Sequence, residues 1–247
     1  MIPVSRQGYK FLSDISIPCY LTDREGALTV SGFMDMAQEI AYWAADGLGF
    51  GYDSLHVHHT AWVLSRMHIQ FLRPTHWRDT VRLYTWHKGA SGLFYLRDFD
   101  LQDNEGNHIV RATSSWVVIN EETRHFVRPE ELAGLLEQKE KLEDSIEEPA
   151  PKIQMPKDAQ PAGAHTVSYS DIDILGHTNN VRYMVWAMDH IPAEDALKQP
   201  VRDVFINFNR ETTLGQTVSL TRLREGNSWF VEGKVDGKSC FVVRIDF

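Results

Sequence analysis

Cysteine is scarce in this chain. Only Cys19 and Cys240 occur among 247 residues, and neither a Cys-x-x-Cys pair nor the Cys/His spacing of a metal site accompanies them. This scarcity argues against a disulfide framework and against a zinc site. Both residues stand in apolar, strand-like surroundings, so the sequence predicts two buried free thiols in a reducing compartment.

Long apolar runs and an excess of positive charge are also missing. No stretch approaches the roughly 18 uninterrupted apolar residues that a membrane span needs, and the opening residues MIPVSRQGYKF hold no apolar core of signal-peptide length. The formal net charge is -9, which disfavours a general nucleic-acid surface because phosphate binding relies on clustered Lys and Arg. We therefore expect a soluble, cytoplasmic protein that binds neither nucleic acid nor membrane.

Apolar residues are plentiful, and their arrangement repeats. Hydrophobic residues make up 43% of the chain, enough for one large core or two small ones. Residues 69–83 (IQFLRPTHWRDTVRL) and 206–220 (INFNRETTLGQTVSL) are identical at seven of fifteen positions at a constant offset of 137. Residues 137–164 hold four of the ten prolines and no aromatic residue, which is typical of a linker. We expect an N-terminal domain at 1–136, this linker, and a C-terminal domain at 165–247.

Each half of the repeat predicts one long helix followed by several strands. In the first half Ser31 is placed to cap a helix that ends at Gly47, and in the second half the helix spans Asn179–Asp189. A further helix is expected to begin at Pro129, with the charged run Glu137–Glu148 as its solvated face. Alternating or β-branched runs predict strands at 61–72, 79–87, 93–103, 109–120, 204–211, 217–225, 228–235 and 239–247, with turns at 104–106, 225–227 and 236–237. The fold class is therefore α+β.

The stretch SDIDILGHTNNVRYMVW places Asp173 and His177 at the entrance of the second helix. A helix N-terminus carries unpaired N–H groups and the positive end of the helix dipole. We expect Gly176, Thr178 and Asn179 to offer such groups to a carbonyl oxygen that gains negative charge in a reaction. Taken alone, Asp173 is more often a turn or cap residue, and His177 more often a surface or satisfied interior histidine.

Two C-terminal segments, SDIDILGHTNNVRYMVW and NFNRETT, resemble motifs of the acyl-ACP thioesterases of plants and bacteria. The segments AWVLSRMHIQFLRPTHWRDTVRLYTW and RATSSWVVINEETRHFVRPEEL of the first half resemble the same family, so the similarity spans nearly the whole chain. The resemblance implies a tandem (double) hotdog fold, in which each half is a long helix packed against an antiparallel sheet. It also implies hydrolysis of fatty acyl thioesters on acyl carrier protein in fatty acid biosynthesis, without a cofactor.

The resemblance assigns catalytic roles to three residues. Asp173 and His177 match the family's catalytic Asp and His, and Glu211 matches the carboxylate that follows an Arg on the first strand after the helix. Water is then the nucleophile and Glu211 its base, while His177 orients one of them and Asp173 holds His177 or the loop. Two positions depart from the family. Leu175 stands where Asn is usual, and Thr212 stands where plant members often have a Cys, which removes a cysteine nucleophile there.

The internal repeat suggests a division of labour between the halves. Glu211 aligns with Pro74, so only the second half keeps the carboxylate, and the first half is expected to supply the wall of an acyl tunnel. On the first helix Met36, Ile40 and Trp43 are candidates for acyl binding, with an ordinary core role as the alternative.

Three histidines, His56, His58 and His59, stand together without an acidic residue at ligand spacing, so we expect no metal site there. Residues 64–128 hold nine Lys and Arg against seven Asp and Glu, which makes this region a candidate docking face for an acidic carrier protein. A duplicated chain pairs its halves internally, so a monomer and a homodimer both stay open.

Two other functions compete with acyl-ACP hydrolysis. The same chemistry serves acyl-CoA, so an acyl-CoA thioesterase is the first alternative. The second is a non-catalytic acyl-binding protein on the hotdog fold, because Leu175 replaces one polar residue of the site.

Overall fold

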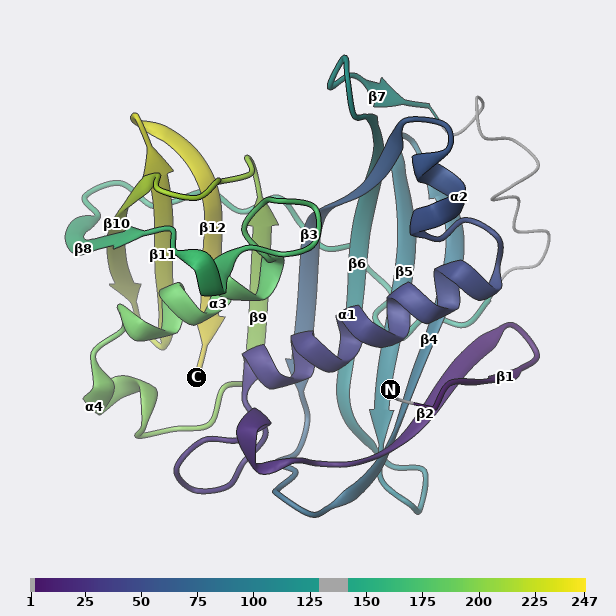
Figure 1. Ribbon diagram of the computed structural model, residues 1–247. Coiled ribbons are helices and arrows are strands. Elements are labelled where there is room, and N and C mark those ends of the chain that lie inside the picture. The colour runs from purple at the N-terminus through teal and green to yellow at the C-terminus, as the bar shows by residue number, and fades with distance from the viewer. Residues whose placement is uncertain (1–2, 129–141) are drawn as a thin grey trace. The chain divides into compact units, whose positions relative to one another are not determined.

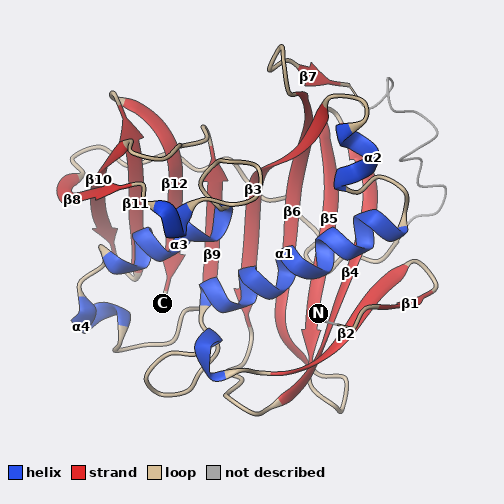
Figure 2. Cartoon of the chain, viewed as in Figure 1, coloured by secondary structure: helices blue, strands red, loops and turns tan. Residues whose placement is uncertain are grey.

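The computed structural model describes residues 3–128 and 142–247 and is drawn in Figure 1. The chain divides into two compact units. The first comprises Met1–Ser65 with Ile69–Ala150, and the second comprises Arg66–His68 with Pro151–Phe247. Each unit combines one long helix with an antiparallel sheet, as the sequence predicts (Figure 2).

In the first unit the sheet has the strand order β1-β2-β4-β5-β6-β3, with β7 paired to β6. Helix α1 lies across one face of this sheet and contacts β2 and β4 (Figure 1). The elements are β1 (Ser5–Gln7), β2 (Lys10–Ser16), η1 (Cys19–Leu21), α1 (Val30–Gly47), α2 (Tyr52–His56), β3 (Thr60–Phe71), β4 (Thr80–Ser91), β5 (Phe94–Gln102), β6 (His108–Asn120) and β7 (Phe126–Val127).

Helix α1 forms because its apolar residues recur on one face, and that face is buried. Its cap differs from the expected one. The Thr29 side chain accepts a hydrogen bond from the Gly32 N–H, so the helix begins before Ser31. It ends at Gly47 as predicted, where a Cβ atom would stand 2.8 Å from the Phe11 ring. The buried face consists mainly of Phe33, Met36, Ala37, Ile40, Ala41 and Ala44.

In the second unit the sheet has the strand order β9-β12-β11-β10-β8, and the shorter helix α3 contacts β12. All four strand pairs of this sheet are antiparallel. The elements are β8 (Gln160–Thr166), η3 (Tyr169–Asp171), α3 (Asn180–Asp189), α4 (Ala193–Ala196), β9 (Asp203–Phe208), β10 (Thr217–Glu225), β11 (Ser228–Val235) and β12 (Lys238–Asp246).

The eight predicted strands are all present, and the repeat is visible in their hydrogen bonds. Strand β9 ends at Phe208, earlier than predicted, because the N–H groups of Asn209 and Arg210 both turn to the Cys240 carbonyl. The first unit repeats this detail after β3, where the N–H groups of Leu72 and Arg73 both turn to the carbonyl of Ile109. Glu211 therefore lies beyond the strand on which it was expected.

The expected linker, residues 137–164, is partly built into the two units. Residues 142–150 pack on the first unit, and residues 160–164 belong to β8. The helix expected from Pro129 lies outside the described residues up to 141, and residues 142–148 of the charged run are not helical. Specific bonds hold this segment to the sheet, so it is not a solvated helix face.

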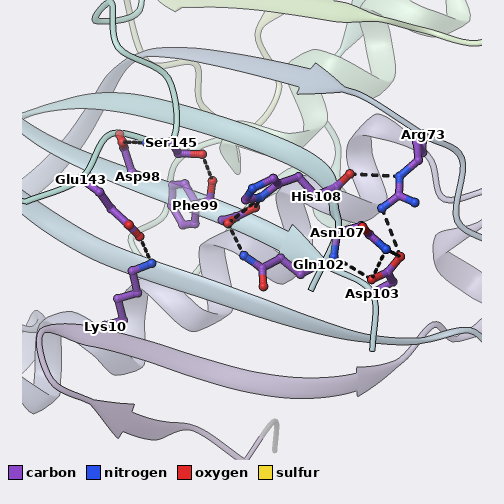
Figure 3. A network of polar contacts seen from close by, with 11 residues as sticks. Lys10, Arg73, Asp98, Phe99, Gln102, Asp103, Asn107, His108, Glu143 and Ser145 are labelled. Atoms are coloured by element: carbon purple, nitrogen blue, oxygen red, sulfur yellow. Dashed lines mark hydrogen bonds and ion pairs between the residues drawn. The ribbon is translucent and has the colours of Figure 1, made fainter. Parts of the chain in front are cut away.

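Ser145 and Glu143 make those bonds (Figure 3). Its N–H donates to the Asp98 carboxylate at 2.7 Å, and its hydroxyl donates to the Phe99 carbonyl at 2.6 Å. Beside it, the Trp86 indole donates to the Glu143 carbonyl at 3.0 Å, and Lys10 pairs with the Glu143 carboxylate. Residues 142–150 therefore cover part of one sheet face of the first unit.

Lys88 joins the same network from β4. Its ammonium lies 3.1 Å from the carboxylate of Asp98 and 2.5 Å from that of Asp144. Burial opposes the charge on Lys88, but the Asp144 and Asp98 carboxylates outweigh it and raise the lysine pKa. Burial also raises the pKa of Asp98, although Thr113, Lys88 and the Ser145 N–H stabilise its ionised form. The Lys88 ammonium and the Asp98 carboxylate thus stabilise each other inside the first unit.

The two thiols have different surroundings. Cys240 is buried on β12 as expected, but Cys19 is exposed, and the prediction of two buried thiols is wrong for it. Cys19 begins the short 3-10 helix η1 after β2 has ended, where the chain leaves the sheet. Among the described residues both cysteines are free, and none of the helices there is long and apolar enough to cross a membrane.

Candidate functional site

The chain enters helix α3 through the short 3-10 helix η3, which Asp171 anchors. The Asp171 carboxylate accepts hydrogen bonds from the Ser168 N–H and from His165 Nε2, both at 2.8 Å. Burial opposes ionisation of this carboxyl, but the bonds from His165 and Ser168 outweigh it and lower its pKa. The His165 ring also stacks on Trp186 of α3, with centroids 4.3 Å apart. Asp171 was not predicted as a site residue, and its role in the structure is to hold the approach to the helix.

Residues Asp173–His177 form the next feature, a tight turn that we call the entrance turn. The Asp173 N–H donates to the His177 carbonyl at 2.9 Å, and the Gly176 N–H donates to the Asp173 carbonyl at 3.0 Å. The Asp173 carboxylate accepts the N–H of Leu175 at 2.9 Å. Gly176 has φ +77°, which favours glycine. Within the described residues, the Asp173 carboxylate makes no hydrogen bond or ion pair with the His177 ring, and its bond to the Leu175 N–H holds the turn.

The structure brings His177 and Glu211 together. His177 Nε2 lies 3.4 Å from Glu211 Oε2, and both side chains are about one-third exposed (32% and 29%). The two residues come from the entrance turn and from the segment after β9, which are far apart in sequence. A partly exposed imidazole and carboxylate at a helix N-terminus form an arrangement that can bind and activate a water molecule.

Three buried hydroxyls lie beside this pair. Thr178 Oγ1 is 2.7 Å from Thr212 Oγ1, and Thr212 Oγ1 is 3.0 Å from the Tyr183 hydroxyl. The Tyr183 hydroxyl also accepts the Thr212 N–H at 3.0 Å, while the Thr178 N–H donates to the Thr212 carbonyl at 2.9 Å. Burial raises the pKa of Tyr183, so the phenol stays protonated. Sequence reasoning missed Tyr183 and the hydroxyl roles of both threonines.

The N–H groups expected to stabilise an oxyanion are already used. Those of Gly176, Thr178 and Asn179 each donate to a backbone carbonyl. The Asn179 side chain is the helix cap and accepts the Val181 N–H. The expectation of oxyanion donors at these three residues is therefore corrected, because folding of the turn already uses their backbone N–H groups.

Two other backbone N–H groups near the start of α3 are candidates for this role. Within the described part of the chain, no acceptor meets the backbone N–H of His177 or of Asn180. Both lie at the N-terminus of α3, where the helix dipole favours negative charge. A carbonyl oxygen gaining charge can be stabilised by these two groups.

The first unit contains a matching turn, Asp23–Ala27, before α1. The Asp23 N–H donates to the Ala27 carbonyl at 2.8 Å, and the Gly26 N–H donates to the Asp23 carbonyl at 3.0 Å. The Asp23 carboxylate accepts the N–H groups of Glu25 and Ala27, both at 2.9 Å. The fold of the turn is therefore duplicated, but Ala27 and Pro74 stand where the second unit has His177 and Glu211.

The candidates for acyl binding lie in the first unit. Met36 and Ile40 are buried in its core, and half-buried Trp43 donates from its indole to Glu39 at 2.7 Å. Their role in acyl binding stays a prediction.

Two of the three histidines near α2 lie beside glutamates. His56 pairs with Glu121 at 3.3 Å and His59 pairs with Glu122 at 3.8 Å. Across residues 3–128 and 142–247, no group of three His, Cys, Asp or Glu side chains is placed to hold a metal ion.

Comparison with protein families gives two matches. The family model of the acyl-ACP thioesterase N-terminal domain matches residues 8–134, and that of the C-terminal domain matches residues 155–239. The chain is 25% identical over 236 residues to the chloroplastic oleoyl-acyl carrier protein thioesterase of Coriandrum sativum, covering 84% of this chain and 61% of the relative. It is 28% identical over 222 residues to the chloroplastic palmitoyl-acyl carrier protein thioesterase of Arabidopsis thaliana, covering 84% and 53%. The chain thus spans less than two thirds of the length of these relatives.

Solved structures agree in fold. An acyl-ACP thioesterase from Bacteroides thetaiotaomicron has a TM-score of 0.85 at 26% identity, covering 97% of this chain and 98% of that one. The 12:0-ACP thioesterase from Umbellularia californica has a TM-score of 0.84 at 23% identity, covering 98% of both chains. The predicted tandem hotdog fold is therefore confirmed.

Proposed function

The chain belongs to the acyl-ACP thioesterase family, and from this premise we propose that it hydrolyses the thioester between a fatty acid and acyl carrier protein. The products are a free fatty acid and the carrier thiol, as a step of fatty acid biosynthesis. The observation that carries the proposal is the His177–Glu211 pair at the N-terminus of α3. A cytoplasmic location is part of the proposal, whereas the plant relatives are named chloroplastic.

Glu211 acts as the general base. Its carboxylate takes a proton from a water molecule as the water oxygen bonds to the thioester carbonyl carbon. The tetrahedral intermediate then collapses, the carbon–sulfur bond breaks, and the sulfur leaves with the proton. His177 lies 3.4 Å from the carboxylate and keeps it and the water in place.

The developing oxyanion is stabilised by the backbone N–H groups of His177 and Asn180. The duplication supports this choice. In the first unit, the N–H of Ala27, which matches His177, is bound by the Asp23 carboxylate at 2.9 Å. In the second unit the Asp173 carboxylate binds the N–H of Leu175 and leaves that of His177 for a ligand. Preorganised donors of this kind usually contribute the largest electrostatic effect in acyl transfer.

The carrier is expected to be a protein. We expect kcat/KM for a long-chain acyl-ACP to exceed that for the matching acyl-CoA at moderate salt, because an acidic carrier gains from the less acidic 64–128 region. The measurement is steady-state hydrolysis of both substrates over several chain lengths. Equal or faster turnover of acyl-CoA would favour an acyl-CoA thioesterase, and binding without turnover of either would favour an acyl-binding protein.

Neither thiol takes part in the reaction. Burial raises the pKa of Cys240, which keeps this thiol protonated, and Cys19 lies in the first unit, away from α3 in sequence. Replacing both by Ser should leave kcat within about twofold, since no reacting group is removed. Iodoacetamide should alkylate exposed Cys19 in the native protein without loss of turnover. A folded double variant that is inactive would contradict the water mechanism.

A further inference from the structure

The residues directly after His177 and Glu211 are joined to each other. Thr178 follows His177, Thr212 follows Glu211, and their hydroxyl oxygens are 2.7 Å apart. Thr212 is completely buried, and the exposed fraction of Thr178 is only 5%. Each threonine is joined through a peptide bond to His177 or Glu211. The contact between the two threonines therefore links the backbones of these two residues.

Tyr183 fixes this junction from the helix. Its hydroxyl contacts both the Thr212 N–H and the Thr212 hydroxyl at 3.0 Å. Its ring packs against Trp186, Phe208 and Phe241, at centroid distances of 5.2, 6.0 and 5.0 Å. The phenol is therefore rigidly held, and it ties Thr212 to the first turn of α3.

The first unit shows what the fold alone requires at these positions. There the Leu28 N–H donates to the Thr75 carbonyl at 2.8 Å, which matches the bond between Thr178 and Thr212. Leu28 replaces Thr178, and buried Phe33, the fourth residue of α1, replaces Tyr183, the fourth residue of α3. The same backbone connection thus forms with two apolar side chains.

We infer that Thr178, Thr212 and Tyr183 form a hydroxyl network that positions His177 and Glu211 for reaction, a role that rests on the proposed function. The backbone bond already holds the turn to the strand end in both units. The hydroxyl bonds occur in the unit that carries the ionisable pair, where a displacement of about 1 Å can cost about 10²-fold in rate. All three are positioning residues, since each acts through its neighbour.

The test removes hydroxyls and keeps shape. Tyr183→Phe and Thr178→Val each remove one hydroxyl, and Tyr183→Phe restores the residue type of the first unit. Each should lower kcat on acyl-ACP by about 10–100-fold with KM changed by less than about twofold, because ground-state binding does not use the network. Thr178→Ser keeps a hydroxyl and should recover most of the lost kcat.

The matched control is Thr75→Val in the first unit. Thr75 is 96% buried, with an exposed fraction of 4%, and its hydroxyl donates to Asp79 at 3.1 Å. This variant should lower Tm without lowering kcat. Wild-type kcat in folded Tyr183→Phe and Thr178→Val would overturn the inference. So would a loss of kcat that only follows the unfolded fraction seen by circular dichroism.

Assays of the wild-type protein on acyl-ACP and on acyl-CoA distinguish failure of this inference from failure of the proposed function. If the wild-type protein hydrolyses acyl-CoA and not acyl-ACP, the choice of carrier fails, and the same variants measured on acyl-CoA still decide the role of the hydroxyls. If the wild-type protein hydrolyses no acyl thioester, both proposals are overturned.

Discussion

Glu211→Gln should lower kcat by about 10²–10⁴-fold and change KM much less. Glutamine keeps the shape of the side chain and its hydrogen-bonding capacity but cannot accept a proton from water. Steady-state kinetics on acyl-ACP measure both constants, with circular dichroism to confirm folding.

Asp173→Asn is the matched comparison. An Asn side-chain oxygen can still accept the Leu175 N–H, so the entrance turn should survive. The kcat of this variant should therefore fall far less than that of Glu211→Gln. If Asp173→Asn is inactive while Glu211→Gln retains near-wild-type kcat, the base has been misassigned and the water belongs to Asp173 and His177.

Lys88→Met should reduce the free energy of unfolding by about 3–5 kcal/mol, the usual cost of leaving a buried charge without its partner. Asp98 is completely buried, and the Lys88 ammonium lies 3.1 Å from its carboxylate. Methionine fills most of the space but supplies no charge. Urea denaturation at neutral pH, followed by circular dichroism, measures the loss.

The control is Arg82→Met on the same strand, β4. Arg82 forms a two-point contact with Asp14, with bonds of 2.5 and 2.9 Å, but both side chains are about half exposed. An exposed pair of this kind contributes about 1 kcal/mol or less, because water already stabilises each charge. An equal loss in both variants would show that Lys88 acts through packing and not through charge.

The effect of Lys88→Met should also depend on pH. Burial raises the pKa of Asp98 in the folded protein, so ionised Asp98 lowers stability at pH values above the ordinary pKa of aspartate, about 3.9. Removing Lys88 raises this folded pKa further. The difference between the variant and the wild-type protein should therefore shrink as the pH falls through the folded pKa and Asp98 becomes protonated. A pH-independent difference would contradict this account.

The helices and strands with a strong apolar period could be predicted from the sequence, whereas β1, β2, β7 and β8 were not predicted. Helix α1 and the eight predicted strands carry apolar periods or β-branched runs because at least one face of each is packed. Strand β1 is fully exposed and β8 is mostly exposed, so neither carries a pattern. Strand β8 also contains Pro161 and Gly163, which are typical of loops.

The segment 142–150 was misread for a similar reason. Charge and proline usually mark a solvated segment, and Glu143 and Asp144 are indeed charged. Their partners Lys10 and Lys88 lie far away in sequence, so the pairing depends on the folded sheet. Composition alone does not contain this information.

The residues of the candidate site could be proposed from the sequence, but the hydrogen bonds around them could not. The resemblance to a family located Asp173, His177 and Glu211, and the structure brings the last two within 3.4 Å. The resemblance did not show which backbone N–H groups form hydrogen bonds within the entrance turn, since these bonds depend on backbone geometry. The role of Tyr183 was also hidden, because a Tyr on an apolar helix face reads as core. Comparing it with Phe33 in the repeat would have been the available signal.

The duplicated turn has a consequence for how the two copies could change after they arose. A duplication gives the chain two versions of each contact, and each version can be lost where it no longer serves a purpose. The first copy has Asp23, Gly26 and the bond between Leu28 and Thr75. At the positions that match His177 and Glu211 it has Ala27 and Pro74. Because these contacts occur in both copies, we attribute them to the start of a hotdog helix and not to the proposed reaction. The proposed reaction then depends on the residues that differ between the copies.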